Sequence, residues 1–257
     1  MKDQSQSLSI RTKRFSGQRR RSPARLDWDA ARVVEELKRL GSRRNVEGMA
    51  RFGIRAKVCY GVAKPALDEL AKEIGKNHQL ALELWDSGVH DARILAGMVD
   101  DAKQVTASQM ERWVRDFDNW DICDGTCCHL FVFTKAAWTK AYAWSKRKNE
   151  FQKRAGFALA AYLAYRDKAA SDGEFREFLK VIEREARDER NFVRKAVNWA
   201  LRNIGKRNLR LNREAIRLAE KLRKNKLPVT RWIAGDALRE LQGEAVQRRV
   251  RKREKGQ

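Results

Sequence analysis

Hydrophobic residues recur every three or four positions along most of the chain, which is the spacing of one face of an α-helix. The first such segments are residues 28–40 and 64–74, and Pro65 and Gly75 suit the start and the end of the second. The same spacing continues at residues 78–86, 90–100, 108–117, 120–133, 135–146, 150–166, 174–187, 189–204, 211–225 and 229–241. The pattern predicts about a dozen helices and no strand, so we expect an all-α fold.

Three of these segments carry a similar Ala- and Leu-containing sequence: AGFAL, RKAVNWAL and RWIAGDAL. Aligning them on Leu159, Leu201 and Leu238 gives a spacing close to the roughly 40–47 residues of HEAT-type helical pairs. We therefore expect a right-handed or curved α-solenoid of HEAT-like repeats, whose concave basic face suits a long ligand. The alternative is an irregular helical bundle in which the Ala-Leu pairs merely recur.

The charge of the chain is strongly positive. Its 257 residues include 57 Lys and Arg against 34 Asp and Glu, a net charge of +23. Residues 1–25 and 244–257 are rich in Arg and poor in large apolar residues, so we expect a disordered basic arm and a disordered basic tail. Residues 26–243 are still basic and contain most of the aromatic residues, so we expect them to form the folded HEAT-like domain.

A surface of this kind attracts polyanions, and nucleic acid is the partner that the charge favours. A solvated surface kept soluble by its charge and, less well, an anionic membrane are the alternatives. The chain contains no apolar run long enough to span a membrane, and three of its four cysteines lie together, at positions 123, 127 and 128. We expect a monomeric cytoplasmic protein, associated with the nucleoid, in a reducing compartment.

The segment NWDICDGTCCHLF places an aromatic ring and a carboxylate side by side. On a helix, Trp120 and Asp124 are one turn apart and lie opposite the main apolar stripe. This pairing suits a functional site. The alternative is that Asp121 caps the helix, Trp120 lies at the edge of the core and Asp124 is solvated.

The helix predicted at residues 189–204 places Trp199 at the edge of its apolar face, beside Lys195 and Arg202. Together with Arg194, these cations are candidate DNA contacts around a stacking surface, although cation–π packing explains the same pattern. In the apolar helix 150–166, Arg154 needs a carboxylate or a phosphate partner. A structural salt bridge and a phosphate contact are the two interpretations.

Cys123, Cys127, Cys128 and His129 have no second spaced pair of ligands, so we expect no metal site. The chain contains no glycine-rich phosphate loop either, and we expect no cofactor. We expect His90 to be a surface or capping residue.

The motifs NWDICD, FQKRAGFAL, RNFVRKAVNWALR and HDARILAGMVDD resemble the DNA alkylation repair proteins, the HEAT-like alkylpurine DNA glycosylases. The resemblance covers most of residues 30–241. It implies hydrolysis of the N-glycosidic bond of cationic N3- or N7-alkylated purines in duplex DNA. It also implies that Asp124 is the catalytic carboxylate, that Trp120 and Trp199 frame the lesion, and that Arg154 contacts a phosphate.

Two other functions fit a HEAT-like fold. The first is a binding module that recognises damaged or structured nucleic acid, with Asp124 catalytically idle. The second is a protein-interaction scaffold, because fold does not dictate function.

Overall fold

The computed structural model describes residues 28–255, which form helices and no strand. The all-α prediction is therefore confirmed for this part of the chain. In chain order the helices are α1 (Ala30–Arg39), α2 (Arg43–Arg51), α3 (Lys64–Ile74), α4 (His78–Asp86), α5 (His90–Val99), α6 (Ala107–Arg115), α7 (Trp120–His129), the 3₁₀ helix η1 (Phe131–Phe133), α8 (Ala137–Trp144), α9 (Glu150–Arg166), α10 (Asp172–Glu185), α11 (Asn191–Gly205), α12 (Leu209–Arg223), α13 (Pro228–Leu241) and α14 (Glu244–Lys255).

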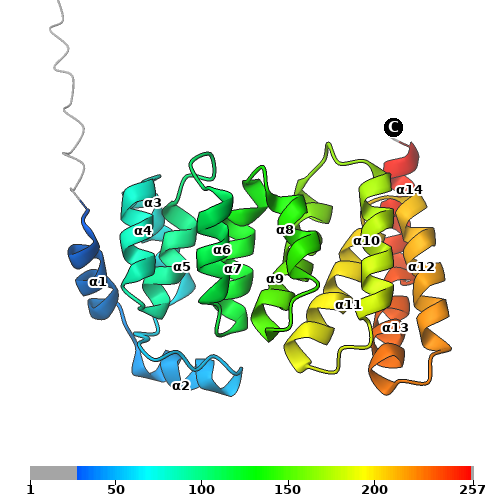
Figure 1. The fold of residues 1–257 in the computed structure, drawn as a ribbon, viewed down its shortest axis with the longest axis horizontal. Helices are drawn as coiled ribbons and strands as arrows, with labels where there is room; N and C mark the ends of the chain where they lie inside the picture. Colours follow the sequence, from blue (N-terminus) through cyan, green and yellow to red (C-terminus); the bar gives the residue numbers. More distant parts are fainter. Residues whose placement is uncertain (1–27, 256–257) are drawn as a thin grey trace, which may run out of the picture.

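The helices pack as a row of antiparallel pairs. Helices α3, α5, α7, α9, α11 and α13 form one layer in which each packs against the next. Helices α4, α8 and α12 pack against α5, α9 and α13 from the second layer. The row runs from α1 at one end to α14 at the other, and α2 lies crosswise below the helices near the α1 end (Figure 1). This repeated pairing matches the period predicted from the sequence.

The three leucines that define this period occupy equivalent places in the fold. Leu159, Leu201 and Leu238 are buried on α9, α11 and α13, three consecutive members of one layer. Leucines spaced by one repeat therefore lie on successive helices of the solenoid, because each helix buries its apolar face against the next. The irregular bundle is excluded as the description of this region.

Side-chain caps and special residues set several helix boundaries. The Oδ1 atom of Asn119 accepts hydrogen bonds from the backbone N–H of Asp121 and Ile122, at 3.0 and 3.1 Å. Asn149 caps α9 in the same way. Asn119, and not Asp121, is thus the cap of α7. Gly75 ends α3 with φ of 72°, a conformation that glycine adopts without strain.

Aromatic residues fill the core between the layers. The rings of Trp85 and Trp113 stack with centroids 4.0 Å apart and planes 3° apart, and both side chains are fully buried. Phe131 and Trp144 continue this cluster towards α9. Large buried rings stabilise such a row strongly, because each removes a large apolar area from water. None of the described helices is long and apolar enough to cross a lipid bilayer.

The structure corrects three boundary predictions. Residues 244–255, expected as part of a disordered tail, form α14, and Val246 and Val250 on this helix are buried. The helix predicted at 120–133 ends at His129, because the backbone of Leu130 leaves the helical region before η1 begins. Helix α2 was not predicted, since none of its residues is buried. The expected basic arm, residues 1–25, lies outside the described residues.

Candidate functional site

Helix α7 carries the candidate carboxylate on its first two turns. Trp120 is the first helical residue and Asp124 lies one turn later, so both side chains face the same side. The apolar face of the helix buries Ile122 and Thr126. Cys123 and Cys127 face α9, and their thiols donate to the carbonyl oxygens of Phe151 and Ala155. Small side chains thus hold α7 close to α9.

Asp124 forms a bidentate ion pair with Arg154 of α9. The Nε and Nη2 atoms of Arg154 donate to Oδ1 and Oδ2 of Asp124 over 2.8 and 2.6 Å. A third donor, Nη1, bonds the carbonyl oxygen of Phe192 at the start of α11 over 2.7 Å. Arg154 is therefore held by three bonds to α7 and α11, and the salt bridge expected as the alternative to a phosphate contact is present.

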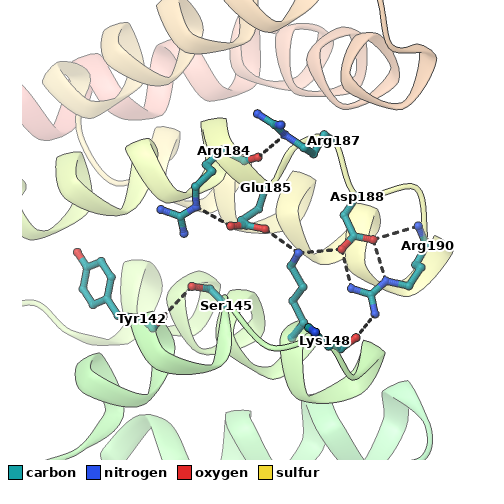
Figure 2. A network of polar contacts seen from close by, with 9 residues as sticks. Tyr142, Ser145, Lys148, Arg184, Glu185, Arg187, Asp188 and Arg190 are labelled. Atoms are coloured by element: carbon teal, nitrogen blue, oxygen red, sulfur yellow. Dashed lines mark hydrogen bonds and ion pairs between the residues drawn. The ribbon is translucent and has the colours of Figure 1, made fainter.

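A second ion-pair cluster fixes the start of α9 on its other side. The Nζ atom of Lys153 lies 2.6 Å from Oε2 of Glu185 and 2.8 Å from Oδ2 of Asp188. Figure 2 shows Asp188 also bound by Arg190, whose guanidinium reaches the backbone of Lys148. Burial opposes ionisation of Asp188, but hydrogen bonds from Arg190 and Lys153 lower its pKa to about 2. The cluster ties α9 to the segment before α11 and so positions Arg154.

The second tryptophan of the site comes from α11. The ring of Trp199 packs edge-to-face on Tyr162 of α9, with centroids 4.9 Å apart. Lys195, one turn before Trp199, is exposed and makes no ion pair within the described chain. Its ammonium group is therefore available to an anion at the mouth of the site.

These residues surround one cavity of 430 Å³. The structure brings together Trp120, Asp124, Arg154, Lys195 and Trp199, all of which the sequence analysis selected. The remaining lining residues are Lys64, Asp121, Gly125, Cys128, His129 and Tyr162. Two indole rings, a phenol and a carboxylate around one hollow can hold a cationic, aromatic or sugar-like group.

Two of the selected cations lie away from this cavity. Nη1 of Arg202 lies 2.5 Å from Oε2 of Glu240 and 3.6 Å from Oδ2 of Asp236, both on α13. The guanidinium of Arg194 lies over the ring of Trp232, 5.0 Å from its centroid. These contacts join α11 to α13, and the roles of Arg194 and Arg202 towards DNA stay predictions.

A larger cavity of 820 Å³ adjoins the first. It lies between α2 and the α3–α5–α7 layer, and Met49, Phe52, Ile54 and Leu67 give it an apolar lining. Trp120 lines both cavities and donates from Nε1 to the carbonyl oxygen of Phe52 over 3.0 Å. The position of Trp120 thus depends on the segment that follows α2.

Burial changes the acid–base properties of the site. It raises the pKa of Asp124, while the charge and hydrogen bonds of Arg154 oppose that shift. It also raises the pKa of Tyr162 and lowers that of His129, so both groups are neutral near pH 7. The Arg154 guanidinium stays charged and donates to both oxygens, which is the geometry of an ionised carboxylate.

Sequence reasoning missed Tyr162 and Asp121 as site residues. Tyr162 lies on the helix 150–166, which is apolar nearly all round and therefore indicates a packed residue, although its position two turns after Arg154 places it on the same face. Asp121 accepts from the buried ring of His90, 3.2 Å from Nε2. The expectation that His90 is a surface or capping residue is therefore wrong. Its ring is buried between α5 and α7 and is bonded to Asp121 instead of to water.

No group of three or more His, Cys, Asp or Glu side chains within residues 28–255 is arranged to hold a metal ion. Cys123 and Cys127 are buried, and burial raises the pKa of Cys123 well above its usual range. A neutral thiol is a poor metal ligand. These cysteines instead serve as small packing residues between α7 and α9.

Comparison with known proteins identifies the family. Among curated proteins, no sequence matches the chain. Among the solved structures that match, one has a TM-score of 0.71 and 24% identity, over 83% of this chain and 96% of that chain. It is described as a new family of proteins related to the HEAT-like repeat DNA glycosylases, with affinity for branched DNA structures. The match shows that this chain has the HEAT-like repeat fold. The model of the DNA alkylation repair enzymes matches residues 33–241, most of the chain, and this protein therefore belongs to that family.

Proposed function

We propose that this protein is a DNA glycosylase that hydrolyses the N-glycosidic bond of cationic N3- or N7-alkylated purines in duplex DNA. The observation that carries the proposal is the cavity that Asp124, Trp120 and Trp199 line together. An alkylated N3 or N7 purine already carries a positive charge, so it leaves as a neutral base without being protonated. The remaining barrier is the positive charge that develops on the sugar.

Asp124 addresses this barrier by electrostatics. Its carboxylate stabilises the developing oxocarbenium ion and orients a water molecule towards C1′. As the bond from C1′ to the purine nitrogen breaks, its electron pair neutralises the base. The water oxygen bonds to C1′ and passes its extra proton to the bulk solvent. Arg154 fixes the direction of the carboxylate through two hydrogen bonds, so no reorganisation is needed at the moment of reaction.

The aromatic residues and Lys195 supply binding. The faces of Trp120 and Trp199 are electron-rich and attract a cationic base or sugar. Lys195 carries a free positive charge at the same cavity and neutralises a backbone phosphate. A positioned carboxylate, aromatic walls and an adjacent cation together favour a substrate that combines positive charge with a phosphate chain.

A second candidate function is binding of structured DNA without base release. Two observations favour it. The solved structure that resembles this protein is described by its affinity for branched DNA. Moreover, both carboxylate oxygens of Asp124 already accept bonds from Arg154, which offsets part of the negative charge that catalysis needs.

The test is base release from methylated duplex DNA. We expect the protein to release 7-methylguanine and 3-methyladenine well above a no-protein control, which measures spontaneous depurination. Binding to a four-way junction and to a duplex of equal length is measured in parallel. Tight junction binding with no release above the control would contradict the glycosylase and support the binding module.

A further inference from the structure

A third cavity, of 260 Å³, lies at the opposite end of α9 and α11 from Asp124. It is lined by five cations, Lys168, Lys206, Arg207, Arg249 and Arg253, and by no acidic side chain. The last two come from α14, which lies beyond residue 241, where the family match ends. This helix therefore adds a cationic wall that the matched region does not contain.

Most of these cations have no carboxylate partner. Arg207 donates to the carbonyl oxygens of Ala164 and Ala170, and Arg253 donates to those of Lys206 and Arg207. Bonds to carbonyl oxygens hold the guanidinium groups in place without neutralising them. Among the five cations, only Lys206 forms an ion pair, with Glu240 on α13. Three carboxylates, those of Asp167, Asp172 and Glu174, act on the charge of Arg207 from beyond ion-pair distance.

Arg249 makes no hydrogen bond or ion pair with the described residues, although it is exposed beside the other four cations. The charges are close enough to affect one another. Burial lowers the pKa of Lys168, and the charges of Arg253 and Arg207 lower it further. Such mutual repulsion is relieved when an anion enters the cluster.

The cavity lies on the same side of α11 as the candidate catalytic site. Lys195 and Trp199 lie on α11, and Lys206 is the residue that caps its C-terminal end. They are four and then seven residues apart, a spacing that places side chains on one side of a helix. Seven helical residues advance by about 10 Å. That distance corresponds to about three phosphates of one DNA strand, which follow at about 3.4 Å along the duplex axis. Tyr165, exposed at the cavity edge, offers a ring to the neighbouring sugar or base.

We propose that Arg249 and Arg253 of α14, with Lys168 and Arg207, bind a backbone phosphate of the DNA strand that enters the Asp124 cavity. The site lies about three nucleotides from the lesion, by the rise of α11. This inference rests on the proposed function insofar as it assumes DNA as the ligand. In this arrangement the C-terminal helix α14 adds one phosphate contact to those made around the Asp124 cavity.

The test compares two double variants of the full chain. Arg249→Ala/Arg253→Ala removes two cations that line the cavity, and Arg248→Ala/Arg251→Ala removes two exposed cations of the same helix outside it. Affinity for a duplex with a central abasic-site analogue is measured over a salt series. We expect the first variant to reduce the slope of log affinity against log salt by about 1 for each phosphate that is no longer neutralised, and the control to change it less.

Phosphate ethylation interference identifies the DNA phosphate that Arg249 and Arg253 contact. In the wild type, ethylation of a phosphate about three nucleotides from the abasic-site analogue should weaken binding. In Arg249→Ala/Arg253→Ala the same ethylation should have no effect. The single variant Arg249→Ala removes no bond within the described chain, so a reduced salt slope in that variant cannot come from unfolding.

The outcomes separate this inference from the proposed function. Equal salt slopes for the two double variants, with wild-type DNA binding intact, would overturn the α14 site and leave the glycosylase untouched. A wild type that binds no DNA at all would overturn both. Single-turnover base release on saturating DNA should be unchanged in the control variant Arg248→Ala/Arg251→Ala, because neither residue lines the Asp124 cavity or the α14 site.

Discussion

Arg154 donates to both carboxylate oxygens of Asp124, from Nε over 2.8 Å and from Nη2 over 2.6 Å, across the interface of α9 and α7. The side chain of Arg154 is 9% exposed and that of Asp124 is 17% exposed. The two charges are therefore compensated inside the protein and not by water. This pair links the candidate carboxylate to the stability of the α7–α9 interface.

Removing either partner should destabilise the fold. We expect Arg154→Ala to lower the free energy of unfolding by about 3–5 kcal/mol, because it leaves the Asp124 carboxylate buried without its counter-charge. The apolar double variant Asp124→Leu/Arg154→Met should cost much less than the sum of the single variants. Urea unfolding is measured for the wild type, Arg154→Ala, Asp124→Leu, Arg154→Met and the double variant. Additive costs would show that the pair is not coupled.

Helices that bury one apolar face could be predicted from the spacing of hydrophobic residues in the sequence. Leu159, Leu201 and Leu238 lie on such faces, so their spacing revealed the repeat. Helix α2 has no buried residue and was missed for that reason. In α14, six Lys and Arg residues obscured Val246 and Val250, whose burial depends on α12 and α13.

The site was predictable only within single helices. The i, i+4 spacing of Trp120 and Asp124 fixes their common face, and both line the cavity. The pairing of Asp124 with Arg154 joins residues 30 positions apart, and periodicity carries no information on such a contact. The buried bond between His90 and Asp121 was missed for the same reason.

Close packing of α9 on α8 makes Gly156 difficult to replace. A Cβ atom there would lie 2.4 Å from the backbone nitrogen of Ser145 and 2.9 Å from the carbonyl oxygen of Ala141. We expect Gly156→Ala to lower the free energy of unfolding by about 1–3 kcal/mol, since backbone atoms cannot move aside cheaply. The matched control is Gly235→Ala on α13, where an added Cβ atom would meet no other part of the protein within 4 Å.

The control should be neutral or stabilising by up to about 1 kcal/mol, because alanine is the better helix former. Thermal unfolding of both variants provides the measurement. Equal melting temperatures would show that α8 and α9 do not approach as closely as described.

Glu111 should make the protein sensitive to acid. Burial alone would raise its pKa, but hydrogen bonds from Lys140, Arg147 and Trp144 outweigh that effect and lower the pKa to about 2. Because the folded pKa lies below the ordinary value of 4.5, the stabilisation is present above pH 4.5 and is lost as the pH falls towards 2. Its size is at most about 3 kcal/mol.

Glu111→Gln tests this dependence. We expect the variant to be less stable than the wild type at pH 6 and similar to it near pH 2, so its stability changes less over that range. Glu189→Gln, at an exposed residue, is the control and should follow the wild-type curve. A constant difference between Glu111→Gln and the wild type at all pH values would contradict the ion-pair origin of the effect.

In the proposed glycosylase reaction, the carboxylate of Asp124 drives base release. The most direct measurement is the single-turnover rate of 7-methylguanine release from saturating methylated duplex, compared between Asp124→Asn and Asp118→Asn. The second variant makes the same chemical change at an exposed residue outside the cavity. We expect Asp124→Asn to lose about two to four kcal/mol of transition-state stabilisation, a roughly 30- to 1,000-fold drop in rate, while DNA affinity is retained. Equal rates in the two variants would contradict the catalytic role of Asp124.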